Sequence, residues 1–303
     1  MKLEFHTLDV FTDERFAGNP LAVVLGADQL DAAQMQRVAR EFNLSETVFV
    51  MKPEDEKHSA RVRIFTPAAE IPFAGHPTIG TAALLAELRS LEVGSGSTAL
   101  IALEENIGVV RVGARMAGNA PTFAEFDAPK LPIEVGVVPS RDELASAVGL
   151  LSGEIGYANH QPTRFSAGAD FTFIPVTSLD SIGKAVANVT HWGRIFVDDS
   201  TVGAFLYTHQ TTHGKSHYHA RMFAPSHGIL EDPATGSAAA AFAGVIARFD
   251  QPGFGLHKRQ IEQGIEMGRP SFISLSLDIK DDGLATVRIG GHAVRVTKGE
   301  IEI

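Results

Sequence analysis

The chain has 303 residues, with 26 Lys and Arg against 36 Asp and Glu, which gives a formal net charge of −10. An acidic chain without a basic run is a poor nucleic-acid binder, so we expect no nucleic-acid partner. No cysteine occurs, which excludes a thiol nucleophile, a zinc–thiolate site and an iron–sulfur cluster. The sequence shows neither a signal-peptide core nor 18 consecutive apolar residues, so we expect a cytoplasmic protein with no membrane partner.

The first half of the sequence is organised around one unusual helix. Residues 77–88 begin with Pro77, which suits the first position of a helix, and continue small or apolar on nearly every side. A helix without a polar face is buried all round, so we expect other elements to enclose it. A capping box from Asp31 to Gln34 predicts a second, amphipathic helix at 31–42. The expected strands cover residues 3–11, 21–25, 47–52, 60–66, 99–104 and 107–114.

The second half has the same kind of organisation. Residues 127–139 contain three prolines and indicate a connection between domains. We therefore expect one domain over 1–127 and another over 128–303, with a last strand able to pair with the first domain. A second apolar helix is expected at 233–248. A helix at 141–150 and strands at 171–176, 193–198, 202–208 and 218–224 complete the expected elements.

Two segments of the chain resemble each other. RIFTPAAEIPFAGHPTIGTAALL begins at Arg63, and RMFAPSHGILEDPATGSAAAAF begins at Arg221. Their first residues match at an offset of 158 and their helices at an offset of 156, which implies a two-residue deletion between the blocks. Repeats of this length indicate duplicated domains. We expect an α+β fold of two similar domains related by a pseudo-twofold axis, each a mostly antiparallel sheet or barrel around its apolar helix.

The repeat also shows where the two halves differ. By these offsets His76 corresponds to Asp232, and Glu46 corresponds to Ala204. One half therefore carries an acid that the other lacks. Such departures from symmetry are reasonable places to look for chemistry, although sequence drift produces them too.

Both apolar helices begin at loops that contain Gly and Pro, AGHPT and EDPATGS. A helix N-terminus offers unpaired N–H groups and a partial positive charge. Two such ends facing each other would bind an anion such as a carboxylate. The alternative is that Pro and Ser or Thr only cap these helices, and the repetition of the pattern favours binding.

Three polar residues near these loops could transfer a proton at carbon. Glu46 would be the carboxylate base, and His76 and Asp232 would supply an acid partner and stabilise an anion. Each residue also has a structural alternative. Glu46 could be a surface acid at a strand end, His76 a buried histidine with its bonds satisfied, and Asp232 an N-cap.

Four histidines gather at His209, His213, His217 and His219. A spacing of four would align the first three on a helix, which raises the question of a metal site. The segment lies between two strand patterns and contains Gly214, so a hairpin loop is expected instead. No nearby cysteine or paired acid completes a site, and we predict no metal.

The motifs occur in the order of a known family. FAGNPLAVVL, NLSETVFV, RIFTPAAEIPFAGHPTIGTA, RMFAP, EDPATGSAA and EMGRPS follow one another from residue 16 to residue 271. In this the chain resembles the PhzF-like (phenazine-biosynthesis-like) isomerase and epimerase family. The resemblance implies the diaminopimelate epimerase-like fold with an active site between two similar domains. It also implies no metal or organic cofactor, and a homodimer.

The resemblance assigns roles to individual residues. In the phenazine enzyme the acid of the LSE motif shuttles a proton during isomerisation of a dihydro-hydroxyanthranilate, and Glu46 matches that acid. The related racemases use two opposed cysteines, which this chain lacks, so isomerisation by one carboxylate is favoured over two-base racemisation. The residues implied to line the site are His76, Asp232, Ser237, Gly75, Gly236 and Asn19.

These observations predict a cofactor-independent isomerase that moves a proton on a small carboxylate-bearing substrate by general acid–base catalysis. The alternative is an enzyme-derived ligand-binding or interaction protein without turnover. The presence of Glu46, His76 and Asp232 together favours the enzyme, because loss of any one would have favoured the binding protein.

Overall fold

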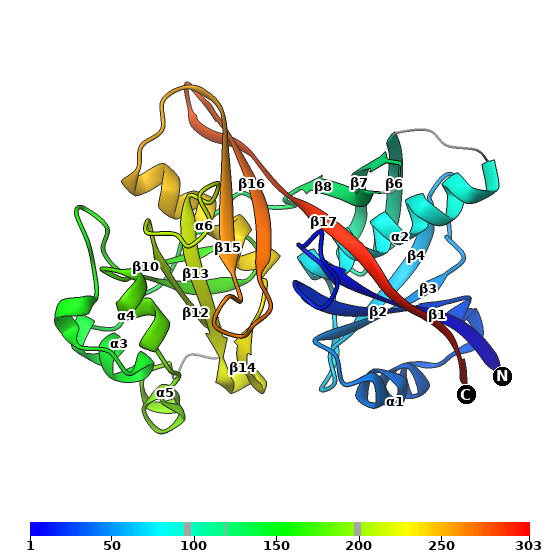
Figure 1. The fold of residues 1–303 in the computed structure, drawn as a ribbon, viewed down its shortest axis with the longest axis horizontal. Helices are drawn as coiled ribbons and strands as arrows, with labels where there is room; N and C mark the ends of the chain where they lie inside the picture. The colour runs from blue at the N-terminus through cyan, green and yellow to red at the C-terminus, as the bar shows by residue number, and fades with distance from the viewer. Residues whose placement is uncertain (94–97, 119, 197–200) are drawn as a thin grey trace. The chain divides into compact units, whose positions relative to one another are not determined.

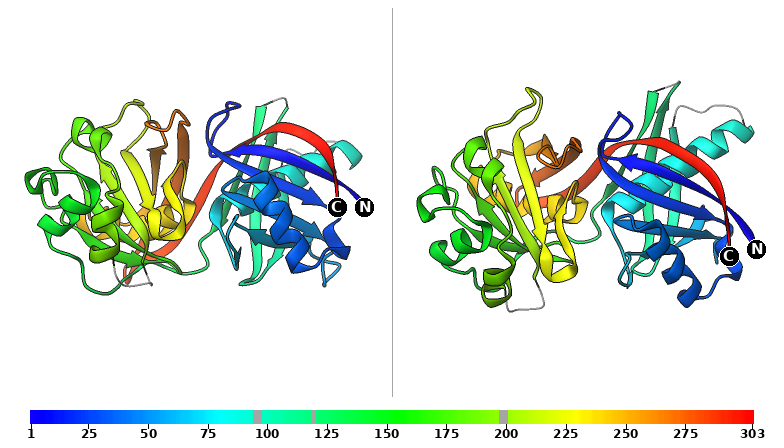
Figure 2. Two further views of the ribbon diagram at one scale, coloured as in Figure 1. Left: turned by 90° about the horizontal axis from the view of Figure 1, so that it is seen from below. Right: turned by 60° about the horizontal axis from the view of Figure 1, so that its bottom comes forward.

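The chain divides into two units, which a computed structural model shows in Figures 1 and 2. Unit 1 comprises Met1–Asp127 and Gly290–Ile303, and unit 2 comprises Ala128–Ile289. The last 14 residues, expected in the second domain with a strand able to pair with the first, therefore belong to unit 1. Among the described residues, no helix is both long enough and apolar enough to cross a membrane. The structure describes residues 1–93, 98–118, 120–196 and 201–303.

Unit 1 is a closed barrel of strands around one helix. Its elements are β1 (Lys2–Val10), β2 (Asn19–Leu25), α1 (Ala32–Phe42), β3 (Glu46–Met51), β4 (Ala60–Phe65), β5 (Glu70–Ile71), α2 (Gly75–Val93), β6 (Thr98–Glu105), β7 (Gly108–Ala117), β8 (Ala120–Asp127) and the end of β17 (Gly283–Glu302). Strands pair in the order β17, β1, β2, β3, β4, β6, β7, β8, and β8 pairs with β17 again. The β2–β3 and β4–β6 pairs are parallel.

Helix α2 runs inside this barrel, where the blue-to-teal strands and the red end of the chain surround it in Figure 1. It contacts β1, β2, β3, β6, β7 and β8, and Ile79, Ala82 and Leu84 have no exposed surface. This confirms that a helix without a polar face is buried on all sides. The helix begins at Gly75, two residues before the expected start, and ends at Val93.

Unit 2 also wraps strands around an apolar helix. Its elements are β9 (Ile133–Glu134), α3 (Arg141–Val148), β10 (Thr163–Ser166), β11 (Asp170–Pro175), α4 (Leu179–Lys184), α5 (Val189–Ile195), β12 (Thr201–Thr208), β13 (Tyr218–Ala224), β14 (Ile229–Asp232), α6 (Gly236–Phe249), β15 (Gly255–Gln263), β16 (Ser271–Lys280) and the start of β17. Strands pair in the order β9, β10, β11, β12, β13, β15, β16, and β11–β12 and β13–β15 are parallel. In α6, every residue from Ala238 to Ile246 is buried.

Two expectations for unit 2 are wrong. Helix α6 starts at Gly236, not at 233, because the chain from Asp232 to Thr235 forms a separate hydrogen-bonded loop. The strand expected at 193–198 is replaced up to residue 195 by α5, whose N-cap Asn188 accepts a hydrogen bond from the His191 backbone. Residues 197 and 198 of that expectation lie outside the described residues.

The internal repeat exists, but its alignment differs from the expected one. In unit 1 Ile71 pairs with Ile64, and in unit 2 Asp232 pairs with Met222. Met222 lies 158 residues after Ile64, whereas Asp232 lies 161 residues after Ile71, so the second copy has three extra residues before its helix. The bidentate ion pairs Arg63–Glu70 and Arg221–Glu231 obey the same shift. His76 therefore corresponds to Ser237, and its expected match with Asp232 is wrong.

The counterpart of Glu46 also changes. Thr47 lies opposite Phe65 in unit 1, and Ala204 lies opposite Phe223 in unit 2. Glu46 is thus the counterpart of Gly203, not of Ala204. A Cβ atom at Gly203 would lie 2.4 Å from the carbonyl oxygen of Phe223. Unit 2 therefore has no room for an acidic side chain at this position.

Candidate active site

The barrel of unit 1 brings together Glu46 and His76. Glu46 is the first residue of β3, beside Leu21 of the parallel strand β2, and His76 is the second residue of α2. Glu46 Oε2 lies 3.2 Å from His76 Nε2. The side chains are only 13% and 5% exposed, respectively. The surface-acid alternative for Glu46 is therefore wrong, because its carboxylate is mostly enclosed and faces the imidazole.

His76 is a neutral imidazole at ordinary pH. Burial lowers the pKa of His76 to about 3, and a hydrogen bond to the Pro20 backbone, which favours the charged form, only partly opposes this. Pro20 can offer only its carbonyl oxygen, so the ring donates an N–H to it. Because Nε2 faces Glu46, the nitrogen that serves Pro20 is Nδ1, and Nε2 of the neutral ring is an acceptor.

Two further residues of the predicted set directly precede residues of this site along the chain: Asn19 precedes Pro20, and Gly75 precedes His76. Asn19 is fully buried at the start of β2, opposite Val10 of β1, and it directly precedes the Pro20 carbonyl that holds His76. Gly75 is the first residue of α2 and directly precedes His76. Unit 1 thus holds four of the seven predicted site residues at one end of its central helix.

The other three residues share one loop in unit 2. Asp232 ends β14, and its carboxylate accepts a 2.6 Å hydrogen bond from the Thr235 hydroxyl. Gly236 begins α6, and Ser237 is half-buried in its first turn. The N-cap of α6 is Thr235, so the N-cap alternative for Asp232 is wrong.

Sequence reasoning missed the residue that fixes this loop. The buried Gln263 donates a 2.7 Å hydrogen bond to the Asp232 carbonyl, and its own side-chain oxygen accepts from the Thr235 backbone at 3.2 Å. One amide thus holds both ends of the turn that leads into α6. No short motif marks Gln263, because its partners lie some 30 residues earlier in the chain.

A second missed residue is Glu105, at the end of β6. Its carboxyl is buried at the first turn of α2, where Thr78 Oγ1 lies 2.7 Å from Glu105 Oε1. Burial raises the pKa of Glu105 to about 8, against a smaller lowering by Thr78. A signal was available, because Ile101 and Leu103 alternate inward along β6 and Glu105 continues their register.

The contacts of Thr78 agree with a protonated Glu105. The Thr78 hydroxyl lies 2.8 Å from the Ala74 carbonyl as well as 2.7 Å from Glu105. A hydroxyl has one proton to donate, so it can donate to Ala74 while accepting from a protonated Glu105. The first turn of α2 is therefore hydrogen-bonded, through Thr78, to the neutral carboxyl of Glu105.

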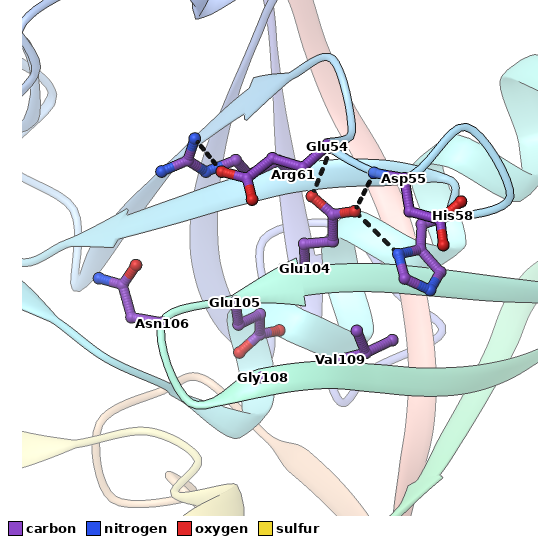
Figure 3. Close-up of a pocket in the computed structure, with 9 residues that line it drawn as sticks. All are labelled: Glu54, Asp55, His58, Arg61, Glu104, Glu105, Asn106, Gly108 and Val109. Atoms are coloured by element: carbon purple, nitrogen blue, oxygen red, sulfur yellow. Dashed lines mark hydrogen bonds and ion pairs between the residues drawn. The ribbon is translucent and has the colours of Figure 1, made fainter.

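A cavity of about 510 Å³ in unit 1 contains none of the predicted site residues (Figure 3). Glu104 accepts hydrogen bonds there from the backbones of Glu54 and Asp55 and contacts His58 at 2.8 Å. Figure 3 shows these groups holding a loop against β6. The acids outnumber the single arginine, so this cavity does not suit an anion. Its lining residues are Glu54, Asp55, His58, Arg61, Glu104, Glu105, Asn106, Gly108 and Val109.

His209, His213 and His217 lie in a loop between β12 and β13, as expected, whereas His219 lies on β13. His219 is buried between Glu262 and Glu266, with ring nitrogens 2.8 and 2.9 Å from their carboxylates. Burial alone would lower the pKa of His219, but these hydrogen bonds raise it to about 9. Glu262 also accepts hydrogen bonds from the Thr212 backbone and hydroxyl. His219 is therefore an imidazolium on β13 that contacts Glu262 of β15, and Glu262 in turn holds the loop through Thr212.

Comparison with known proteins identifies the family. Residues 8–299 match the phenazine biosynthesis-like protein family. The chain belongs to this family. It is 47% identical over 298 residues to an uncharacterized isomerase of Mesorhizobium japonicum, covering 97% of each chain. It is 34% identical over 297 residues to the trans-2,3-dihydro-3-hydroxyanthranilate isomerase of Pseudomonas aeruginosa, covering 96% of each.

Solved structures confirm the fold class. A phenazine biosynthesis protein of the PhzF family from Bacillus anthracis matches with a TM-score of 0.89 and 26% identity, covering all of both chains. A probable proline racemase from Agrobacterium radiobacter matches with a TM-score of 0.64 and 11% identity, over 99% of this chain and 93% of that one. The fold is thus the predicted α+β racemase and epimerase type. The family and the names of its relatives make this protein an isomerase.

Proposed function

We propose that this isomerase moves a proton along the carbon skeleton of a small carboxylate-bearing substrate, with Glu46 as the group that carries the proton. The observation that carries the proposal is the 3.2 Å approach of Glu46 Oε2 to His76 Nε2 in an enclosed part of unit 1. A placed carboxyl and imidazole are the groups that general acid–base catalysis at carbon uses. Proton transfer between them and a substrate requires no cofactor.

The state of His76 supports a division of roles. Two acceptor atoms 3.2 Å apart repel each other unless a proton lies between them. Burial disfavours the imidazolium form of His76, so we propose that Glu46, of these two groups, carries the proton. We propose that Glu46 gives this proton to one substrate carbon and takes one from another, while His76 holds the carboxyl in place.

The lack of an acid at the repeat position of Glu46 supports one-carboxylate chemistry. The repeat position of Glu46 in unit 2 is Gly203, where a side chain would collide with the Phe223 carbonyl. No cysteine is present to act as an opposed base. A single acid that donates and accepts in turn performs a proton shift, whereas racemisation uses two opposed groups.

The substrate class rests on charge and on the relatives. Helices α2 and α6 begin at Gly75 and Gly236, and their first N–H groups favour a carboxylate. The relative from Pseudomonas aeruginosa is named for trans-2,3-dihydro-3-hydroxyanthranilate, a cyclic carboxylate. We propose that the substrate is a compound of this type. Asp232, Ser237 and Asn19 are proposed to contact it.

Glu46→Gln tests the proposal. The change keeps the size of the side chain and removes its capacity to exchange a proton. With trans-2,3-dihydro-3-hydroxyanthranilate as the first substrate, followed by other small cyclic amino and hydroxy acids, we expect kcat to fall by about 10²–10⁴-fold. Substrate Kd should stay within a few fold. In D₂O, the unchanged protein should place deuterium at the carbon that receives the proton.

Glu41→Gln is the matched control, because Glu41 is an exposed residue of α1 and undergoes the same chemical change. It should leave kcat unchanged. Full turnover by Glu46→Gln would remove Glu46 from the mechanism. Tight binding of a carboxylate by the unchanged protein without turnover of any compound would instead favour the binding-protein alternative.

A further inference from the structure

Three polar side chains from distant parts of unit 2 converge near the end of α6. His160 Nε2 lies 3.0 Å from Asp250 Oδ1, and His209 Nε2 lies 3.6 Å from the same oxygen. The three atoms all lie within 4.8 Å of one another. Asp250 is the C-cap of α6, and His209 directly follows β12. The proposed isomerase chemistry uses none of these residues.

The second ring nitrogen of each histidine is already engaged. His209 Nδ1 lies 3.4 Å from the carbonyl oxygen of His217, and His160 Nδ1 lies 3.0 Å from the hydroxyl of Tyr207. A carbonyl only accepts, so His209 carries its proton on Nδ1 and turns the lone pair of Nε2 toward Asp250. Histidines that bind metals are oriented in this way by a partner on the far side of the ring.

A positive charge would stabilise the group of atoms that meet here. The lone pair of His209 faces a carboxylate oxygen that also only accepts, so a proton or a cation between them would favour this arrangement. Two ligand atoms held at about 2.1 Å by a tetrahedral ion lie roughly 3.4 Å apart. The distances from Asp250 Oδ1 to His160 Nε2, 3.0 Å, and to His209 Nε2, 3.6 Å, lie on either side of this value.

We propose that His160, His209 and Asp250 form a binding site for a divalent transition-metal ion of the Zn²⁺ class. The ligands are the two Nε2 atoms and Oδ1 of Asp250. Two imidazoles and one carboxylate are a donor set that Zn²⁺ accepts in proteins, with a water or another small ligand in the fourth position.

The surroundings fit such a site. Tyr218 donates a hydrogen bond to Oδ2 of Asp250, so the carboxylate is oriented with Oδ1 toward the histidines. His160 is buried and stacks on Tyr157, with ring centroids 4.7 Å apart. His209 is 46% exposed and leaves one side open to solvent. A metal can therefore enter from that side and keep a solvent ligand.

Within unit 2, the site lies at the opposite end of α6 from Asp232, Gly236 and Ser237. Helix α6 starts at Gly236, after the loop that holds Asp232, and its C-cap is Asp250. Its 14 residues span about 20 Å at roughly 1.5 Å per residue. The inference therefore does not depend on the proposed function. Its immediate consequence is for unit 2, because the ion would join the loop at His160, the end of β12 and the end of α6.

Zn²⁺ titration of the full chain tests the proposal, with protein purified without a histidine tag and treated with a chelator. We expect calorimetry to show one ion bound per chain, and Co²⁺ to give the visible absorption of a four-coordinate ion. Removing the partner that orients a metal-binding histidine costs about 10–100-fold in affinity, so His209→Ala should lose at least that much. Zn²⁺ should raise Tm in the unchanged chain and not in His209→Ala.

His213→Ala is the matched control, because His213 is exposed in the same loop and its ring contacts Phe272 instead. It should bind Zn²⁺ as the unchanged chain does. Asp250→Asn gives an independent measurement. If the Asp250→Asn variant unfolds because it loses the hydrogen bond from Tyr218, the His209→Ala variant, changed at a half-exposed position, still tests the metal site. Absence of saturable binding, or equal losses in His209→Ala and His213→Ala, would overturn the site. NMR detection of a His209 imidazolium in a chain that binds no Zn²⁺ would show that a proton supplies the charge.

Discussion

His76 and Glu105 lie at the first turn of α2 and make the stability of unit 1 depend on pH in opposite directions. Burial lowers the pKa of His76 to about 3. The neutral ring's contribution to the free energy of unfolding is therefore present above pH 6.5, and it is lost as pH falls toward 3. Burial raises the pKa of Glu105 to about 8. The contribution of Glu105 to the free energy of unfolding is complete below pH 4.5, the ordinary pKa of a glutamate. It is lost as pH rises through 8.

Glu105→Gln should therefore stabilise the protein at high pH. An amide keeps the contact with Thr78 and never ionises, so the free energy of unfolding at pH 9 should rise, by at most about 5 kcal/mol for a shift of this size. At pH 5 the change should be small, because Glu105 is then neutral in the folded protein. Urea unfolding at both pH values measures this. Glu56→Gln, at an exposed position, is the control and should change neither value. Equal effects at pH 5 and pH 9 would show that Glu105 is ionised in the folded protein.

At the scale of elements, β13 and β15 are joined by a buried ion pair between His219 and Glu262. His219→Gln removes the imidazolium that lies between Glu262 and Glu266 and leaves both carboxylates without it. Breaking a buried pair on one side costs about 3–5 kcal/mol, and we expect a loss of that order in urea unfolding at pH 7. His227→Gln, at an exposed position, should cost little. A loss below 1 kcal/mol would mean that the pair is not charged.

The sequence predicted elements best where the signal is local. The two apolar helices were predicted because a helix whose sequence has no polar face must be enclosed by other elements. Strands enclose both α2 and α6. The strand expected at 193–198 was wrong because capping by Asn188 stabilises the helix α5 over a segment with no clear periodicity. Glu105 was missed although its inward register was readable, whereas Gln263 acts on Asp232 through a contact that no local pattern encodes.

At the scale of the whole molecule, matching residues in the sequence revealed the repeat, but the two apolar helices were aligned at the wrong offset. Apolar helices rich in alanine match at several offsets, so the sequence could not choose between 156 and 161. Strand pairing chooses, because Ile71 and Asp232 occupy the same place relative to β4 and β13. The correction pairs Glu46 with Gly203 and His76 with Ser237. Unit 2 therefore has neither a carboxyl nor an imidazole at the positions that correspond to the proposed acid–base pair.

The last strand links the two units through the chain, since β17 begins in unit 2 and closes the barrel of unit 1. Gly290 lies at that closure, where a Cβ atom would meet Glu125 Cβ at 2.8 Å and the Ala124 carbonyl at 3.0 Å, both on β8. Gly290→Ala should therefore destabilise unit 1 by about 1–3 kcal/mol, as overpacking does.

Hydrogen exchange read by mass spectrometry can locate the effect of Gly290→Ala. Exchange should accelerate in β1, β8 and the end of β17, and it should not change in β11 to β13 or α6 of unit 2. Gly253→Ala is the control, because a Cβ atom there meets nothing within 4 Å. Equal acceleration in both units would mean that they unfold as one. Confinement to unit 1 would show that its barrel is a separate cooperative unit, and isomerase activity should then fall with it, because Glu46 and His76 both depend on that barrel for their 3.2 Å approach.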